Sequence, residues 1–208
     1  MQQYAVVVPV KPPARGKSRL AGLDDDRRRE LAAAFALDTV AACLATPRVA
    51  RVLVATDDAG FATRLSGLGA SVVPDGDGRG LNPVLRQAAA EAGRRWPDLV
   101  PVALCADLPT LRADDLEAAL GAASDLGGEP AYVADHTGLG TTTYVAPVAR
   151  FAPAFGPGSA QAHRRGGAVA LPGVLRTLRL DVDDLDDLDA AAVEGLGPAT
   201  AAVWPVVR

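Results

Sequence analysis

Residues 101–106 have the sequence Pro-Val-Ala-Leu-Cys-Ala, and Asp107 follows them directly. A short apolar run that stops at a charged residue is typical of a strand buried on both faces of a parallel sheet. The run at residues 5–10, Ala-Val-Val-Val-Pro-Val, has the same character. The two runs predict buried strands of one sheet, which helices must cover on both faces.

Strand and helix patterns alternate on both sides of residues 101–106. Further strands are predicted at 51–56 and 71–74, and helices at about 24–45, 58–68, 82–96 and 113–124. Asn82 is the expected cap of the third helix. Beyond about residue 130 we expect strands at 131–134, 142–146 and 175–182, then an acidic helix at about 183–194. This alternation predicts a single α/β domain with right-handed crossovers.

Composition narrows the class of protein. Of 208 residues, 49% are hydrophobic and 22% charged, which excludes a disordered or fibrous chain. The net charge of -4 argues against binding to a nucleic-acid polymer or an anionic membrane, since both require a basic surface. The sequence has neither a signal-peptide pattern nor an apolar stretch of roughly 20 residues. We therefore expect a cytoplasmic protein, with Cys43 and Cys105 as small core residues.

A basic loop follows the first predicted strand. Lys11, Arg15, Lys17 and Arg19 place four cations in nine residues, with Gly16 among them. Such a loop can hold a polyphosphate, but a solvated surface loop has the same composition, and spacing does not separate these interpretations. The loop has neither the Walker A nor the GxGxxG pattern.

Carboxylates follow two of the predicted strands. Asp107 ends a buried strand, where a divalent cation would compensate its charge. The alternative is a helix cap, although Asp114 is better placed for that role. Asp181 and Asp183, two residues apart, would share one strand face and could hold a metal, or they could belong to the acidic start of the next helix. The remaining acids of this segment are interpreted as a solvated helix start: Asp186, Asp187 and Asp189.

Two glycine-rich loops could bind an anion through backbone N–H groups. They span residues 138–143 and 155–159. Ser159 would contact the anion or cap the following helix, and the cap is the commoner role. His163 is interpreted as a structural histidine with satisfied hydrogen bonds rather than as a phosphate contact.

The basic loop and the aspartates at two strand ends together suggest metal-assisted nucleotidyl transfer. In that reaction an anionic substrate attacks the α-phosphate of a nucleoside triphosphate, and the protein positions the reactants and neutralises charge. Two metal ions held by shared carboxylates would stabilise the attacking and leaving oxygens.

Six short motifs occur in the order found in one known family. They are Val8-Pro9-Val10-Lys11, Gly16-Lys17-Ser18-Arg19-Leu20-Ala21, Gly80-Leu81-Asn82, Ala106-Asp107-Leu108-Pro109, Phe155-Gly156-Pro157-Gly158-Ser159 with His163, and Leu180-Asp181-Val182-Asp183 with Asp187-Leu188. Each motif is weak alone, but six in order are specific. From about residue 5 to 190 the chain resembles the 2-phospho-L-lactate and phosphoenolpyruvate guanylyltransferases of deazaflavin coenzyme F-420 biosynthesis.

The resemblance implies a fold and a reaction. The fold is one nucleotidyltransferase domain, residues 1–208, with a mostly parallel mixed sheet, helices on both faces and a Rossmann-like first half. Residues up to about 130 would bind the nucleotide, and residues 131–208 the acceptor and the metal. The reaction is transfer of GMP from GTP to phosphoenolpyruvate, which releases pyrophosphate and gives enolpyruvyl-diphospho-5′-guanosine. The alternative acceptors are 2-phospho-L-lactate and 3-phosphoglycerate; the Thr-rich residues 140–143 favour phosphoenolpyruvate.

The resemblance also implies roles for individual residues. Mg²⁺, expected as two ions, would be held by Asp107, Asp181 and Asp183. GTP would be bound by Lys11, Lys17, Arg19 and Asn82. The substrate carboxylate would be received by Thr141, Gly156 and Ser159. The catalytic pair would be Lys17 and Asp107. The partners would be small molecules; a homodimer and a hand-over of product to the next enzyme are left open.

Two other function classes are weighed against this one. Asp181-Val182-Asp183 has the DxD pattern of nucleotide-sugar glycosyltransferases, but that pattern normally lies mid-chain, where Asp107 stands alone here. A non-catalytic GTP-binding module would keep the fold without turnover, and the presence of all three candidate metal ligands argues against it. A dehydrogenase is disfavoured because the dinucleotide glycine fingerprint is absent.

Overall fold

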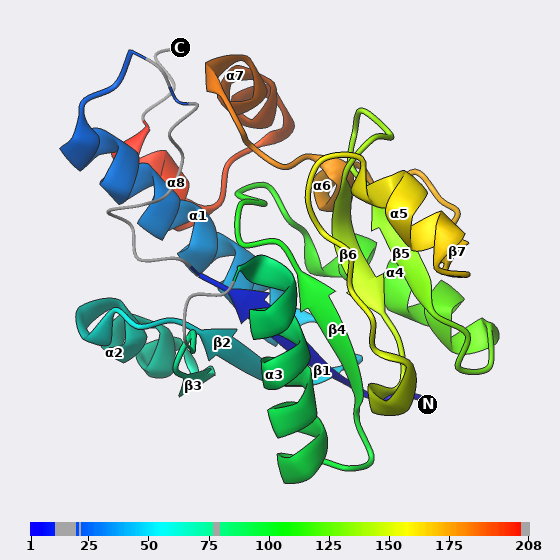
Figure 1. The fold of residues 1–208 in the computed structure, drawn as a ribbon. Coiled ribbons are helices and arrows are strands. Elements are labelled where there is room, and N and C mark those ends of the chain that lie inside the picture. The colour runs from blue at the N-terminus through cyan, green and yellow to red at the C-terminus, as the bar shows by residue number, and fades with distance from the viewer. Residues whose placement is uncertain (11–19, 21, 77–79, 205–208) are drawn as a thin grey trace.

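The computed structural model describes residues 1–10, 20, 22–76 and 80–204. This part contains one seven-stranded sheet with the order β3-β2-β1-β4-β6-β5-β7 (Figure 1). Its strands are β1 (Tyr4–Pro9), β2 (Val49–Ala55), β3 (Ser71–Val73), β4 (Val100–Leu104), β5 (Ala131–Ala134), β6 (Thr141–Val145) and β7 (Val169–Ala170). In the described sheet β6 runs antiparallel to both neighbours and the other pairs are parallel. The predicted α/β class with a mostly parallel mixed sheet is confirmed.

Helices cover both faces of this sheet. They are α1 (Asp25–Ala45), α2 (Ala59–Leu68), α3 (Leu81–Arg95), α4 (Ala113–Asp125), α5 (Ser159–Arg165), α6 (Arg176–Arg179), α7 (Leu185–Glu194) and α8 (Pro198–Val203), with a 3₁₀ turn, η2 (Val148–Arg150). Val6 and Val8 of β1 pack in one core cluster with α1, α2 and α4. Ala5 and Val7 pack in a second cluster with α3 and α5, and Figure 1 shows α3 crossing in front of β1. Because one layer or the other buries each of these positions, β1 needs an uninterrupted apolar run.

The reversed direction of β6 determines which residues share one edge of the sheet. Leu104, the last residue of β4, lies opposite Thr143, and the Cys105 N–H donates to the Thr142 carbonyl at 2.9 Å. Ala134, the last residue of β5, lies opposite Thr141. The carboxyl ends of β4 and β5 therefore meet the amino end of β6. Ligands of open α/β sheets bind at this kind of edge.

The carboxyl-terminal segment folds back over α1. The buried Asp38 carboxylate on α1 accepts hydrogen bonds from the Ala199 and Thr200 N–H groups, at 2.9 and 2.8 Å, and so satisfies the first turn of α8. Gly197 precedes α8, and a Cβ there would lie 2.3 Å from the Asp38 Cγ, so the close approach requires glycine. Val182 packs in a third cluster with α1 and α7. This docking carries Val182 and its neighbours to the end of β4.

The strand predicted at residues 175–182 is wrong. Leu175 has a positive φ of 40°, and the helical turn α6 follows it. The Thr177 N–H and hydroxyl both donate to Asp115 Oδ2, at 2.8 and 2.7 Å. Arg179 donates to the carbonyl oxygens of residues 134, 171 and 173. These tertiary contacts hold the segment as a turn although its composition favours a strand.

Two predicted helix caps also differ. Asn82 lies inside α3, whose N-cap is Gly80 with a φ of 103°, a conformation that favours glycine. Asp114 lies in the first turn of α4, whose N-cap is Arg112. Cys43 is completely buried, as predicted. Among the described helices, none has the length and apolar character needed to cross a membrane.

Candidate active site

Asp107 lies just beyond the end of β4, in a turn that α1 holds in place. The Thr39 hydroxyl on α1 accepts a hydrogen bond from the Leu108 N–H at 3.2 Å and contacts the Ala106 carbonyl at 3.3 Å. Thr39 therefore bridges the residues on either side of Asp107. The Asp107 carbonyl accepts a hydrogen bond from the Val182 N–H at 3.0 Å. Through this bond the structure brings the segment of Asp181 and Asp183 beside Asp107, although that segment is not the predicted strand.

The Asp181 carboxylate is the electrostatic centre of this cluster. Its side chain is 20% exposed, and its Oδ1 atom is buried without a hydrogen-bond partner among the described residues. Burial, followed by repulsion from Asp107, Asp135 and Asp183, raises the pKa of Asp181 to about 7. Four carboxylates thus lie near one another at one edge of the sheet. Ionising all of them is unfavourable unless a positive charge binds between them.

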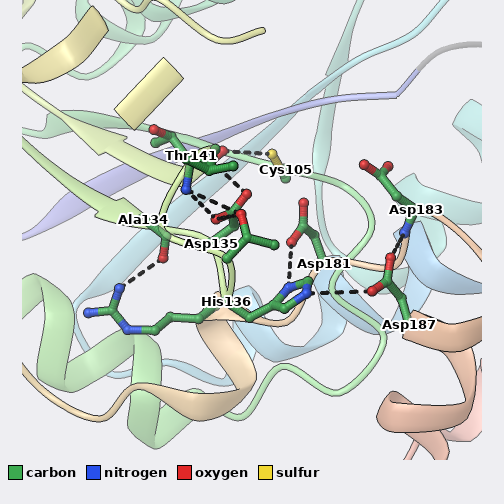
Figure 2. A network of polar contacts seen from close by, with 12 residues as sticks. Cys105, Ala134, Asp135, His136, Thr141, Asp181, Asp183 and Asp187 are labelled. Atoms are coloured by element: carbon green, nitrogen blue, oxygen red, sulfur yellow. Dashed lines mark hydrogen bonds and ion pairs between the residues drawn. The ribbon is translucent and has the colours of Figure 1, made fainter. Parts of the chain in front are cut away.

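His136 supplies part of that positive charge when it is protonated. Figure 2 shows its ring between two carboxylates: Nδ1 lies 3.6 Å from Asp181 Oδ1, and Nε2 lies 3.6 Å from Asp187 Oδ1. The other carboxylate oxygen of Asp187 accepts hydrogen bonds from the Asp183 and Asp184 N–H groups at 2.9 and 3.2 Å. The interpretation of Asp187 as a merely solvated helix residue is therefore wrong, because it orders the backbone of the Asp183 segment and completes the capping box of α7.

The donor set of this cluster fits a hard divalent cation. Carboxylate oxygens are the ligands that Mg²⁺ and related ions prefer, and a cation would offset both the burial of Asp181 Oδ1 and the repulsion around it. The described side chains do not by themselves form a group of three ligands close enough to chelate an ion. Mg²⁺ is usually held by one or two carboxylates together with water and substrate phosphates, so this arrangement is compatible with an ion that binds with its substrate.

Asp135 holds the loop between β5 and β6 together. Its Oδ2 accepts a hydrogen bond from the Gly140 N–H at 2.8 Å, and its Oδ1 accepts from the Leu139 N–H at 3.2 Å and the Thr137 hydroxyl at 2.8 Å. The expectation that these glycine-rich residues offer their N–H groups to an external anion is therefore wrong for Leu139 and Gly140. These two N–H groups donate to the Asp135 side chain instead. The loop that Asp135 holds ends at Thr141, the first residue of β6.

Gly140→Ala is expected to destabilise this loop. A Cβ at position 140 would lie 2.2 Å from Asp135 Oδ2, so the carboxylate must move and lose its hydrogen bond to the Gly140 N–H. Overpacking of this kind costs about 1–3 kcal/mol of unfolding free energy, measurable by urea denaturation. Gly67→Ala in α2 is the matched control, because no atom lies within 4 Å of its added Cβ. Equal stability of the two variants would contradict the prediction.

Thr141, His163 and Ser159 form a buried polar group beside this loop. Thr141 Oγ1 lies 3.0 Å from His163 Nδ1, and His163 Nε2 accepts the Ala154 N–H at 2.9 Å. Ser159 is 2% exposed and is the first residue of α5; the cap is Gly158, so the cap interpretation of Ser159 is wrong. His163 has both ring nitrogens hydrogen-bonded, as its interpretation as a structural histidine requires.

The segment that contains Gly156 is fastened to α3. The Asn82 amide donates to the Phe155 carbonyl at 2.9 Å and its oxygen accepts the Phe155 N–H at 2.8 Å. Gly156 follows with a φ of 136°, which a side chain would strain. Asn82 thus positions the loop that contains Gly156. Its second amide hydrogen is the one that could donate to guanine, the contact that the resemblance implies.

Other predicted residues lie at the margin of the site or beyond the described chain. Lys11, Lys17 and Arg19 lie outside the described residues. Cys105 is half-buried and packs against the second core cluster, as a small core residue would, and its thiol lies 3.5 Å from the Thr141 carbonyl. Sequence reasoning missed Asp135 and His136. Asp135 follows a predicted strand as Asp107 does, and the same rule applied to residues 131–134 would have found it.

Comparisons with known proteins identify the family. The family model described as guanylyl transferase CofC like matches residues 4–159. Proteins named phosphoenolpyruvate guanylyltransferase from Thermomonospora curvata and Streptomyces coelicolor are 49% and 48% identical to this chain. The alignments cover 96% and 97% of this chain, and 88% and 95% of those proteins.

Solved structures show the same fold at low identity. A putative nucleotide-diphospho-sugar transferase from Desulfovibrio desulfuricans has a TM-score of 0.66 at 18% identity, over 91% of this chain and 86% of that one. A Mycobacterium tuberculosis protein in complex with manganese has a TM-score of 0.53 at 20% identity, over 92% and 98%. The sheet, the cluster of aspartates at its edge and the match over most of the chain agree: this chain belongs to the guanylyl transferase CofC-like family and is a nucleotidyltransferase.

Proposed function

We propose that the protein transfers GMP from GTP to the phosphate of phosphoenolpyruvate, forming enolpyruvyl-diphospho-5′-guanosine for coenzyme F-420 biosynthesis. One observation carries the proposal: the carboxylates around Asp181 and the buried Thr141–His163–Ser159 group meet at one edge of the sheet. The carboxylates suit a cation-bound triphosphate, and the hydroxyl groups suit the carboxylate of an acceptor. The relatives named for phosphoenolpyruvate support this choice of acceptor.

The chemistry requires positioning more than proton transfer. An oxygen of the acceptor phosphate forms a bond to the α-phosphorus of GTP. The bond from that phosphorus to the bridging oxygen breaks, and pyrophosphate leaves with the electron pair. A phosphate monoester has a second pKa of about 6, so the attacking oxygen needs no general base near neutral pH. The protein's task is alignment and neutralisation of charge.

Asp107, Asp181 and Asp183 are the residues that would hold Mg²⁺, which would supply positive charge to the phosphates during transfer. Residues up to about 130 would bind GTP, with Lys11, Lys17 and Arg19 on the triphosphate and Lys17 as a catalytic residue. Support for this division comes from the pairing of β1 with β4, because the chain that leaves β1 starts at the same edge as Asp107. Thr141, Gly156 and Ser159 would receive the acceptor carboxylate.

The test is direct product analysis. The protein is incubated with GTP, Mg²⁺ and, in separate reactions, phosphoenolpyruvate, 2-phospho-L-lactate or 3-phosphoglycerate, and pyrophosphate and product masses are measured. We expect the highest kcat/KM with phosphoenolpyruvate and no product in EDTA. A preference for 2-phospho-L-lactate or 3-phosphoglycerate would keep guanylyl transfer and change the acceptor. Absence of product with all three acids would refute the proposal.

A further inference from the structure

The His163 imidazole is enclosed by aromatic rings. It is 2% exposed and stacks between Tyr132 of β5 and Tyr144 of β6, with ring centroids 5.7 and 4.7 Å away. The Phe155 ring meets it edge-on at 5.3 Å. The three rings come from both strands and from the loop that contains Gly156, so they fix the plane of the imidazole relative to the proposed acceptor site.

Its hydrogen bonds determine which ring nitrogen carries the proton. The Ala154 backbone N–H can only donate, so His163 Nε2 must present its lone pair. In the neutral ring the hydrogen is therefore on Nδ1, which faces the Thr141 hydroxyl at 3.0 Å. Burial keeps this ring neutral by lowering the pKa of His163 to about 4. The Thr141 oxygen accepts from Nδ1–H, and its own hydrogen points away from the imidazole.

We infer that His163 is a positioning residue for the acceptor carboxylate, an inference that rests on the proposed function. Its Nδ1–H contacts Thr141, one of the three residues that would receive the carboxylate, and His163 lies on the same helix, α5, as a second of them, Ser159. Through Ala154 and Phe155 it holds the loop of the third, Gly156. The bond from His163 makes the Thr141 hydroxyl a donor, which is the role that a carboxylate requires. Because the imidazole is neutral, it orients the Thr141 hydroxyl and adds no positive charge to the site.

Steady-state kinetics with single and double variants test this inference. His163→Phe keeps a ring between Tyr132 and Tyr144 but removes both nitrogen contacts; Thr141→Val removes the hydroxyl. Each variant is expected to raise the KM for phosphoenolpyruvate at least about tenfold, with the KM for GTP and kcat changed less than about threefold. The combined loss in the double variant should be smaller than the product of the two single losses, since both changes remove the same Thr141–His163 interaction. His163→Asn keeps an N–H donor and should recover part of the loss.

A control separates positioning from simple packing. Phe151 meets the same Tyr144 ring edge-on, with the ring centroids 5.4 Å apart. Phe151→Leu removes an aromatic contact and should lower the melting temperature, with the KM for phosphoenolpyruvate unchanged. Nitrogen-15 NMR of the imidazoles gives a second readout: His163 should remain in the Nδ1–H form from pH 8 to about pH 5, with His136→Gln used to assign the signals.

Each outcome decides between the alternatives. The positioning role would be overturned if the variants kept the wild-type kcat and raised the KM values for GTP and phosphoenolpyruvate equally. Additive effects in the double variant, or an imidazole protonated on Nε2, would overturn it as well. No product from the wild-type protein with any acid would refute the proposed function, and the role of His163 with it. A selective rise in the KM for phosphoenolpyruvate, non-additivity and the Nδ1–H ring together would support the inference.

Discussion

Asp107→Asn is expected to lower kcat/KM by roughly 10²–10³-fold or more while the protein keeps its fold. Asparagine has nearly the shape of aspartate, and the backbone contact from the Asp107 carbonyl to the Val182 N–H does not depend on the side chain. The turn held by Thr39 is also made by backbone groups of the neighbouring residues. The substitution therefore removes a charge that would help to hold the cation and leaves these backbone contacts in place.

The experiment compares kcat/KM for GTP at saturating acceptor in the wild type, Asp107→Asn and Asp98→Asn. Asp98 is an exposed aspartate before the start of β4, at the opposite end of the strand, so its variant should behave as the wild type. Circular dichroism and the melting temperature verify that each variant is folded. Wild-type rates in Asp107→Asn would remove this aspartate from the mechanism.

Asp181→Asn is expected to raise the unfolding free energy of the metal-free protein at pH 8. The same variant is expected to have no activity when Mg²⁺ is present. The pKa of Asp181 is raised from 3.8 to about 7 because its carboxylate is buried and faces Asp107, Asp135 and Asp183. Between these pH values the folded protein binds a proton that the unfolded chain does not. The unfolding free energy of the metal-free protein therefore falls as the pH rises from about 4 to about 7, by an amount on the order of 4 kcal/mol.

Asparagine removes the ionisation and with it this pH dependence. Urea denaturation in EDTA at pH 5, 6, 7 and 8 should show the fall in the wild type and a much flatter profile in Asp181→Asn. Asp189→Asn, at an exposed position of α7, should keep the wild-type profile. Mg²⁺ should stabilise the wild type most at high pH, where Asp181 is ionised, and should have little effect on Asp181→Asn. A wild-type profile that is flat in EDTA would contradict the raised pKa.

These two substitutions separate what the cluster does for activity from what it does for stability. Without a cation, repulsion among clustered carboxylates destabilises the folded protein. A variant that removes this repulsion becomes more stable while it loses activity. Burial is the first cause of the raised pKa of Asp181, and repulsion from Asp107 is the second. The stabilising effect is accordingly expected at Asp181.

Local sequence pattern predicts the elements whose physics is local. The apolar runs of β1 and β4 can be recognised because these strands are buried on both faces, and the helices between them show the alternation expected of an α/β sheet. Asp107 could be singled out because it ends such a run. The strand predicted at residues 175–182 is wrong because Thr177 and Arg179 hydrogen-bond to distant elements, which local composition does not reveal.

The sequence by itself determined the fold class, the family and the identity of Asp107, Asp181, Asp183, Thr141, Gly156 and Ser159 as candidate site residues. Only the tertiary structure decided that His136 lies between Asp181 and Asp187. It alone also decided that Asp135 hydrogen-bonds the loop before Thr141. It also decided the tautomer of His163 through the Ala154 N–H. The physical reason is that apolar periodicity is written along the chain, whereas the charge and hydrogen-bond partners of a buried polar group are supplied by segments far away in sequence.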